Sequence, residues 1–225
     1  MKAQSDASAT HTFVFADLAG YTALTEAHGD EEAAEAAAGF HDAVRSLLPD
    51  HDAEEVKAIG DALLVRVTDA AKAAGLAERI VCDYGTRHRA LSVRVGMHTG
   101  TAVSRAGDWF GRTVNIASRV ADLARAGEVL CTEATRRALG PAVPLRERGS
   151  AAFKNLVEPI AIYQFVLTSR AGPDLPLDPV CLMGVDSERA VERREHAGVE
   201  YHFCSRRCAE AFDDCPEVYV TRVAT

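Results

Sequence analysis

The stretch Phe13-Val14-Phe15-Ala16-Asp17-Leu18-Ala19-Gly20-Tyr21-Thr22 places one carboxylate directly after a run of apolar residues. Residues 11–15 predict a short buried strand, and Asp17 lies just past its end. Two roles are open to this carboxylate: a cap on a following helix, or a ligand in a site at the strand end. Taken alone, the position of Asp17 favours the role of a helix cap.

A second stretch, Val56-Lys57-Ala58-Ile59-Gly60-Asp61-Ala62-Leu63-Leu64, predicts a hairpin. Residues 55–59 and 62–67 have the composition of strands, and Gly60-Asp61 between them is a turn signal. Asp61 is a simple turn residue unless its strand lies beside the strand that ends at Asp17. If the strands are neighbours, the two carboxylates converge, and converging carboxylates are usual ligands of Mg²⁺ or Mn²⁺.

The remaining chain alternates predicted helices and strands. Helices are predicted over residues 30–48, where acidic residues begin the segment and Pro49 ends it, and over residues 69–88 and 113–124. Further strands are predicted over residues 91–97, 128–131, 143–148 and 160–167. This order predicts an α+β fold, with helices on one face of a mostly antiparallel sheet.

A third stretch, Gly107-Asp108-Trp109-Phe110-Gly111-Arg112-Thr113-Val114-Asn115-Ile116-Ala117-Ser118-Arg119, carries further polar candidates. Asn115 and Arg119 are four residues apart, so they project from one face of the predicted helix. Trp109 and Phe110 are expected to be packing residues.

Together the three stretches resemble the class III adenylyl/guanylyl cyclase catalytic domain over residues 10–168. The resemblance implies a ferredoxin-like fold, which agrees with the predicted order of elements. It also implies conversion of ATP to 3′,5′-cyclic AMP and pyrophosphate. Asp17 and Asp61 would hold two Mg²⁺ or Mn²⁺ ions per active site, which activate the ribose 3′-hydroxyl for in-line displacement at the α-phosphorus.

Lys57 and Asp108 resemble the pair that recognises adenine in this family. A lysine donates to a purine ring nitrogen, and an aspartate accepts from the exocyclic amino group. Guanine presents a carbonyl at that edge and would leave a buried acceptor unpaired, at a cost of a few kcal/mol. ATP is therefore the expected substrate, and guanylyl cyclase activity is the enzymatic alternative.

In the same resemblance, Asn115 orients the ribose, Arg119 meets charge on the transferring phosphate, and Lys154 contacts the terminal phosphates. Asn155 stands where the family usually has glycine, and asparagine tolerates left-handed backbone angles. Metal ligands of one subunit face base-reading residues of the other in this family. A chain with both sets is therefore expected to form a homodimer.

The last fifth of the chain is rich in cysteine. Residues 169–176 are predicted to be a linker, and residues 177–220 resemble a YHS domain in Asp178-Pro179-Val180-Cys181 and Tyr201-His202-Phe203-Cys204. Leu182 replaces the glycine usual after the first cysteine.

Three thiols of this small module suit Zn²⁺ or Cu⁺. Cys204 and Cys208 are spaced i, i+4, and Cys181 approaches them from a preceding turn. A structural zinc site normally has four ligands, and three residues of the module are candidates for the fourth: Cys215, His202 and His196. Packed or redox-active free thiols are the alternative.

The overall composition and charge bear on the expected partners and location of the protein. The 225 residues carry a net charge of −8, which argues against nucleic acid or an anionic membrane as the main partner. Residues 1–11 show no secretory signal and no segment has the length of a membrane span, so a cytoplasmic protein is expected. A non-catalytic nucleotide-binding or metal-sensing regulator is the non-enzymatic alternative.

Overall fold

The computed structural model describes residues 9–84, 87, 89–167 and 175–223. Most of the predicted linker, residues 169–174, lies outside this described part of the chain. The first domain contains the strands β1 (Thr10–Leu18), β2 (Ala53–Ile59), β3 (Ala62–Val67), β4 (Val93–Thr101), β5 (Val103–Arg105), β6 (Asp108–Phe110), β7 (Val129–Thr132), β8 (Leu145–Ala151) and β9 (Ile160–Phe165). Its α-helices are α1 (Tyr21–His28), α2 (Asp30–Leu47), α3 (Ala70–Arg79), α4 (Arg112–Leu123) and α5 (Glu133–Leu139).

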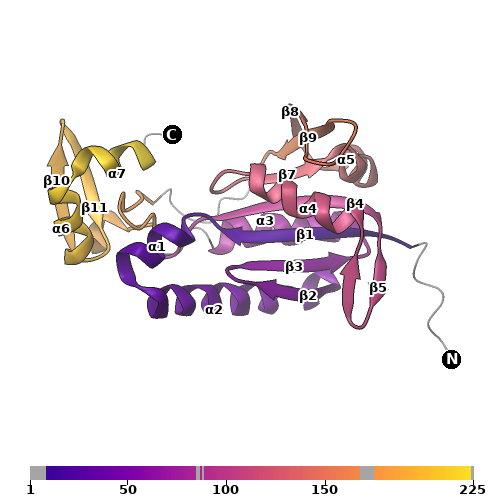
Figure 1. Ribbon diagram of the computed structural model, residues 1–225, viewed down its shortest axis with the longest axis horizontal. Coiled ribbons are helices and arrows are strands. Elements are labelled where there is room, and N and C mark those ends of the chain that lie inside the picture. The colour runs from indigo at the N-terminus through magenta and orange to yellow at the C-terminus, as the bar shows by residue number, and fades with distance from the viewer. Residues whose placement is uncertain (1–8, 85–86, 88, 168–174, 224–225) are drawn as a thin grey trace.

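Seven strands form one sheet in the order β2-β3-β1-β4-β7-β9-β8 (Figure 1). The β4–β7 pair is parallel and the other neighbours in this sheet are antiparallel. Strands β5 and β6 form a separate hairpin at one end of the sheet. The predicted α+β class with a mostly antiparallel sheet is confirmed.

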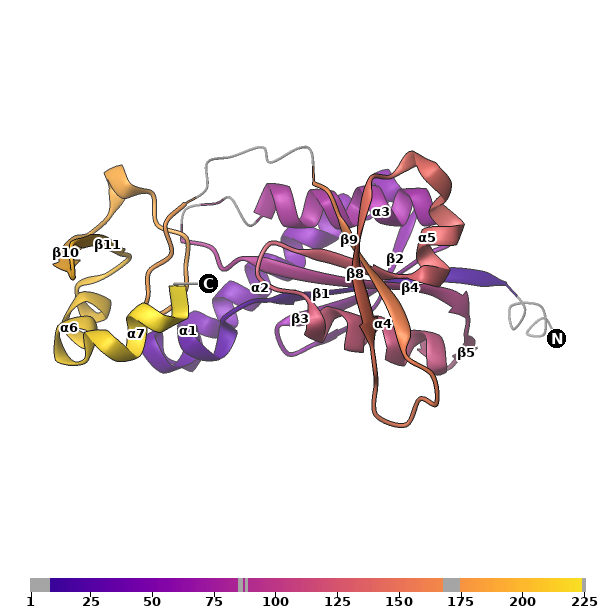
Figure 2. The same ribbon diagram turned by 90° about the horizontal axis from the view of Figure 1, so that it is seen from above.

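Helices cover both faces of the sheet, whereas the sequence had predicted helices on one face. Figure 2 shows α3 and α5 on one side of the strands and α4 on the other. Along β1, Val14 and Ala16 join a core cluster with Phe40 of α2, whereas Phe13 joins a second cluster with Val114 of α4. Both alternating sets of β1 are apolar, so both faces of this central strand have to be buried.

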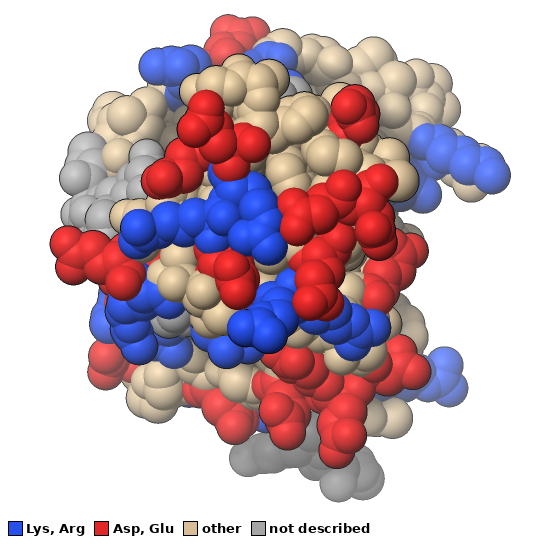
Figure 3. All heavy atoms as spheres, turned by 90° about the vertical axis from the view of Figure 1, so that its left-hand side faces the viewer, with Lys and Arg blue, Asp and Glu red and all other residues tan. Residues whose placement is uncertain are grey.

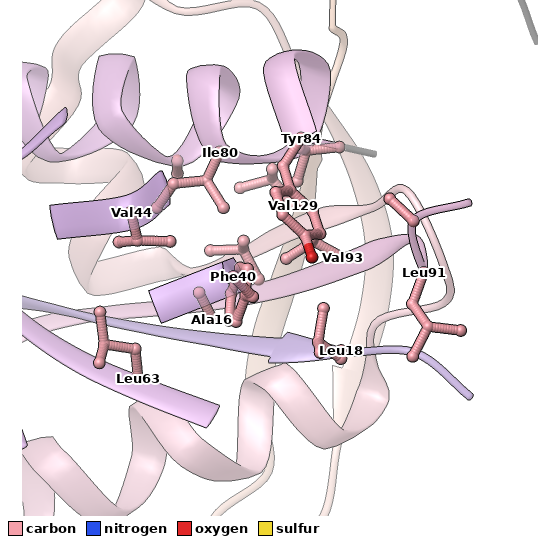
Figure 4. Packing of buried hydrophobic residues seen from close by; sticks show 14 of the residues in the cluster. Ala16, Leu18, Phe40, Val44, Leu63, Ile80, Tyr84, Leu91, Val93 and Val129 are labelled. Carbon is pink, nitrogen blue, oxygen red and sulfur yellow. The ribbon is translucent and has the colours of Figure 1, made fainter. Parts of the chain in front are cut away.

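The larger cluster lies between the sheet and the helices α2 and α3. Phe40 and Val44 of α2 point toward Ala16 and Leu63 of the sheet (Figure 4). Phe40 and Leu63 are fully buried. This packing fixes β1 and β3 side by side and so determines where their ends lie.

Helix α4 approaches the other face of the sheet at Gly96 of β4. A Cβ atom built on Gly96 would lie 2.0 Å from the backbone nitrogen of Ala121 and 2.6 Å from the carbonyl oxygen of Ala117. Only glycine allows the helix backbone to lie this close to the strand. The position of α4 on the sheet therefore depends on the absence of a side chain at residue 96.

Several predicted elements differ from the observed ones in length or type. The helix predicted over residues 69–88 is α3 followed by a π-helical turn, Ile80–Tyr84. A 3-10 turn, Pro49–His51, follows α2, and another, Gly140–Ala142, follows α5. Helices α1 and α5 are short and were not predicted, because seven or eight residues give too little periodicity to detect.

The C-terminal module contains β10 (Glu192–His196), β11 (Val199–Phe203), α6 (Arg206–Asp214), α7 (Pro216–Val223) and a 3-10 turn, Ser187–Arg189. It lies beside α1, at the end of the sheet remote from the β5–β6 hairpin (Figure 1). Backbone bridges join the two parts: Leu91 pairs with Met183, and the Arg89 N–H donates to the Gly184 carbonyl over 2.8 Å. Among the described residues, no helix is both long and apolar enough to cross a bilayer.

Candidate active site

Asp17 and Asp61 come together at one end of the β1–β3 pair. Asp17 is directly opposite Ala62 in the antiparallel register, and Asp61 precedes Ala62 in the two-residue loop between β2 and β3. Gly60, the first residue of that loop, has φ +61°. Burial, with the Asp17 charge beside it, raises the pKa of Asp61 to about 6. Two carboxylates held this close are suited to share a cation.

Arg94 of β4 is a third member of this group, and the sequence analysis did not identify it. It lies opposite Asp17 in the register, and its Nε donates to Asp17 Oδ2 over 2.7 Å. The Asp17 side chain is only 13% exposed, so the guanidinium offsets part of the cost of burying this charge. The one available signal was the basic residue within an otherwise apolar strand pattern.

Lys57 and Asp108 meet on the surface although 51 residues separate them. Lys57 Nζ donates to Asp108 Oδ2 over 2.7 Å, and the Trp109 N–H donates to Asp108 Oδ1 over 2.7 Å. The hydrogen bond from Lys57 lowers the pKa of Asp108. Lys57 lies opposite Leu64, and Leu64 packs with Val114 of α4, so Lys57 is on the α4 face of the sheet.

Trp109 and Phe110 have different surroundings. Trp109 is 8% exposed and packs edge-on against His11 at 4.7 Å and Phe13 at 5.8 Å between ring centroids. Phe110 is 51% exposed, and Lys57 Nζ lies 5.8 Å from its ring centroid. The packing role expected for both residues fits Trp109 but not Phe110, because alternate residues of the short strand β6 face opposite ways.

Arg119 and Lys154 also meet. Asn115 and Arg119 both lie on α4, Asn115 is exposed, and Arg119 Nη1 donates to the Lys154 carbonyl over 2.5 Å. Asn155 has φ +67°, the left-handed conformation that asparagine tolerates. The turn that presents Lys154 is therefore formed without the glycine usual in the family.

The three thiols of the C-terminal module form a buried cluster. The Sγ atoms of Cys181 and Cys204 are 3.5 Å apart, and those of Cys204 and Cys208 are 3.8 Å apart. Cys204 follows β11, Cys208 lies on α6, and Cys181 lies in the turn after Asp178. Three convergent thiols with little solvent exposure are a suitable donor set for a soft or borderline metal ion.

The three candidates for a fourth ligand lie elsewhere. Cys215 is exposed, His202 Nε2 is 3.1 Å from Glu200 Oε1, and His196 packs edge-on against the ring of Phe212. The group that meets the thiols is His28, the last residue of α1 in the first domain. Sequence spacing gave no signal for it, because 176 residues separate His28 from Cys204.

Comparison with known proteins identifies two family domains in the chain. Residues 3–167 match the model of the adenylate and guanylate cyclase catalytic domain, and residues 177–223 match the YHS domain. The chain is 40% identical over 131 residues to a pH-sensitive adenylate cyclase of Mycobacterium tuberculosis, covering 58% of this chain and 33% of that protein. It is 38% identical over 116 residues to an adenylate cyclase of Streptomyces griseus, covering 52% and 29%. The chain thus spans about a third of the length of these relatives.

Solved structures share the fold of the first domain. An adenylate cyclase of Trypanosoma brucei, described in its monomeric state, superposes with a TM-score of 0.67 at 23% identity, covering 75% of this chain and 95% of that one. The adenylyl cyclase CyaB of P. aeruginosa superposes with a TM-score of 0.61 at 24% identity, covering 72% and 95%. The chain belongs to the family of adenylate and guanylate cyclase catalytic domains, and it carries a YHS domain after that domain.

Proposed function

We propose that the protein is an adenylyl cyclase that converts ATP to 3′,5′-cyclic AMP and pyrophosphate. The observation that carries the proposal is the Lys57–Asp108 pair, because these two residues carry opposite hydrogen-bonding roles at one place on the surface. Adenine needs one donor to a ring nitrogen and one acceptor for its amino group. A pair of this kind supplies both, and the named relatives are adenylate cyclases.

Adenine binding has to replace the contact between Lys57 and Asp108. Their side chains are 37% and 29% exposed, so the pair is partly solvated and little is lost when each group turns to the base. GTP would place a carbonyl against the Asp108 carboxylate, and this unfavourable contact discriminates between the two purines.

Asp17 and Asp61 are the residues that would hold Mg²⁺ or Mn²⁺. Their oxygens fit these hard cations, and the pKa of Asp61 is raised by burial and by the neighbouring Asp17 charge, both of which a bound cation would offset. Bound ions would lower the pKa of the ribose 3′-hydroxyl and neutralise charge on the leaving pyrophosphate. Arg94 fixes the Asp17 carboxylate in place before substrate arrives.

The other residues bind and orient the nucleotide. Asn115, exposed on α4, would donate to the ribose, and Arg119, one helical turn later, would meet charge on the α-phosphate. Lys154 would reach the terminal phosphates from the neighbouring turn, whose carbonyl holds Arg119. Catalysis in this scheme rests on positioning and electrostatics.

A homodimer with two shared sites is part of the proposal. Apolar side chains are exposed around Lys57 and Asp108: Ile59 is 48%, Val103 54% and Phe110 51% exposed. Apolar side chains that cluster on a surface beside polar groups are typical of a protein interface. The second subunit would cover them and bring its Asp17 and Asp61 to the nucleotide.

Nucleic acid and membranes are not proposed as partners. At the end of the molecule that carries the C-terminal module, basic and acidic side chains alternate over the visible face without a broad patch of one sign (Figure 3). Together with the net charge of −8, this distribution gives little attraction for a polyanion.

The test uses turnover of ATP by two variants, alone and mixed. Asp17→Ala and Arg119→Ala should each lose roughly 10³-fold or more of the activity. Asp30→Ala, at the exposed start of α2, is the matched control and should keep full activity. In a shared-site dimer, an equal mixture of the two inactive variants regains about a quarter of the activity, since half of the dimers contain one intact site. Full activity of Asp17→Ala would refute the proposed site, and no recovery in the mixture would refute its sharing between subunits.

A further inference from the structure

His28 and the three thiols form a closed set of four ligand atoms contributed by both domains. His28 Nε2 lies 3.4 Å from Cys204 Sγ and 3.3 Å from Cys208 Sγ. All four ligand atoms, including Cys181 Sγ, lie within 4.8 Å of one another. The three cysteines are at most 2% exposed, and the His28 side chain is 5% exposed.

The spacing matches that of a tetrahedral zinc site. Zn–S bonds of about 2.3 Å and Zn–N bonds of about 2.0 Å place tetrahedral ligands about 3.8 Å apart for two sulfurs and about 3.5 Å apart for sulfur and nitrogen. The observed S–S distances are 3.5 and 3.8 Å, and the S–N distances are 3.3 and 3.4 Å. These four separations, with all four ligand atoms within 4.8 Å of one another, suit a single ion bound by the four residues.

Neighbouring groups hold the ligands in that arrangement. His28 Nδ1 is 3.0 Å from Glu32 Oε2, so the ring donates its Nδ1–H to a carboxylate and presents the Nε2 lone pair to the thiols. The buried Asp178 carboxylate accepts the Cys204 N–H over 2.9 Å and the Cys181 N–H over 3.4 Å. Carboxylate-supported histidine and fixed cysteine backbones are typical of metal sites.

We propose that His28, Cys181, Cys204 and Cys208 bind one Zn²⁺ ion, and that this ion joins the C-terminal module to helix α1 of the cyclase domain. The set is closed by protein ligands, which suits a structural rather than a catalytic ion. A metal held by the three cysteines alone would stabilise the module without fixing it to its neighbour. His28 turns the same ion into a link between domains.

The linked helix leads directly to Asp17. Helix α1 begins after Gly20, whose φ is +96°, and a Cβ atom on Gly20 would lie 3.0 Å from the side chain of Leu182. Leu182, at φ +64°, follows the ligand Cys181 and stands where the YHS family usually has glycine. The module therefore holds α1 at both ends, through Leu182 at Gly20 and through the ion at His28.

The first experiment measures metal binding by the full-length chain. One Zn²⁺ per chain should bind, and Co²⁺ in its place should give the absorption of tetrahedral cobalt with thiolate ligands. His28→Ala should weaken Zn²⁺ binding by about 100-fold or more, as expected when a ligand or its support is lost. His196→Ala and Cys215→Ser, which leave the cluster intact, are matched controls and should bind as the wild type does.

X-ray absorption of the wild-type zinc protein tests the ligand set without any variant. Three sulfurs and one imidazole nitrogen are expected. The proposal would be overturned by a spectrum that shows four sulfurs, or three sulfurs without an imidazole. It would also be overturned by an unchanged Zn²⁺ affinity in His28→Ala, or by loss of Zn²⁺ binding in His196→Ala or Cys215→Ser with His28→Ala unaffected.

The second experiment follows α1 by hydrogen exchange. Removing zinc from the wild type should speed exchange in residues 21–28, whereas His28→Ala should show the fast exchange whether or not zinc is present. Equal protection of α1 with and without zinc would contradict a link through this helix. Any effect of zinc on cyclic AMP formation would depend on the proposed cyclase function as well as on this metal site. Binding and exchange are measured without nucleotide, so a chain with no cyclase activity would still give both results.

Discussion

Substituting Gly96 by alanine tests how the fold positions helix α4, which carries the proposed site residues Asn115 and Arg119. The Cβ atom would lie 2.0 Å from Ala121 N and 2.6 Å from both Ala117 O and Ala121 Cα, all of them backbone atoms of α4. Ordinary contacts begin near 3.4 Å, so α4 has to move away from β4 by roughly 1 Å or more. Overpacking of this kind costs about 1–3 kcal/mol, and contact with backbone places Gly96→Ala at the upper end.

Thermal unfolding and turnover measure the two consequences. A loss of about 3 kcal/mol lowers the Tm of a domain of this size by about 6–12 °C. Asn115 and Arg119 move with α4, and given their proposed roles at the ribose and the α-phosphate, a displacement of about 1 Å should reduce kcat by about 100-fold. We expect the loss of Tm and the loss of kcat in the same variant, because the contact of residue 96 with α4 determines both the stability of the fold and the position of Asn115 and Arg119.

Gly39→Ala is the matched control for this substitution. Gly39 is exposed in the middle of α2, and a Cβ atom there meets nothing within 4 Å. Alanine should stabilise this helix by about 1 kcal/mol and leave turnover unchanged. A Gly96→Ala variant with the Tm and kcat of the wild type would show that α4 does not lie this close to β4, and would refute both expected losses.

Two further predictions concern the polar groups of the site. Asp61→Asn should abolish turnover yet raise the Tm of the metal-free protein at pH 7.5. The Tm rises because the pKa of Asp61 is raised to about 6 in the folded state, so the ionised carboxylate destabilises the fold above that pH and asparagine removes it. The gain should shrink as the pH falls through 6 and vanish near pH 4; a gain that is the same at pH 4, or a lower Tm at pH 7.5, would contradict the account of the pKa. Lys57→Ala should lower kcat/KM for ATP and reduce the preference for ATP over GTP by about 10- to 100-fold, measured by steady-state kinetics with each nucleotide; an unchanged preference would remove Lys57 from base recognition.

Much of the local structure could be predicted because its signals are short in range. The Gly60-Asp61 loop follows from a glycine between two apolar segments, and the helix from Asp30 follows from its acidic start and its end at Pro49. The meeting of Asp17 with Asp61 needed one assumption, that β1 and β3 are neighbours, and this assumption is correct.

Other features depend on long-range packing that leaves little trace in the sequence. Arg94 contacts Asp17 only because β4 lies on the other side of β1, which a strand pattern does not specify. His28 meets Cys204 and Cys208 only when the C-terminal module lies against α1. The second covered face of the sheet did leave a trace in the sequence, since both Phe13 and Val14 of β1 are apolar, and this pattern indicates a strand that is buried on both faces.

The most direct test of the central claim is product analysis. The purified chain is incubated with ATP or with GTP in the presence of Mn²⁺, and the nucleotides are separated by chromatography. We expect cyclic AMP from ATP, little cyclic GMP from GTP, and neither product from Asp17→Ala. Cyclic GMP as the main product would contradict the role given to Lys57 and Asp108, and no cyclic nucleotide from a chain that is dimeric in solution would contradict the proposed enzyme.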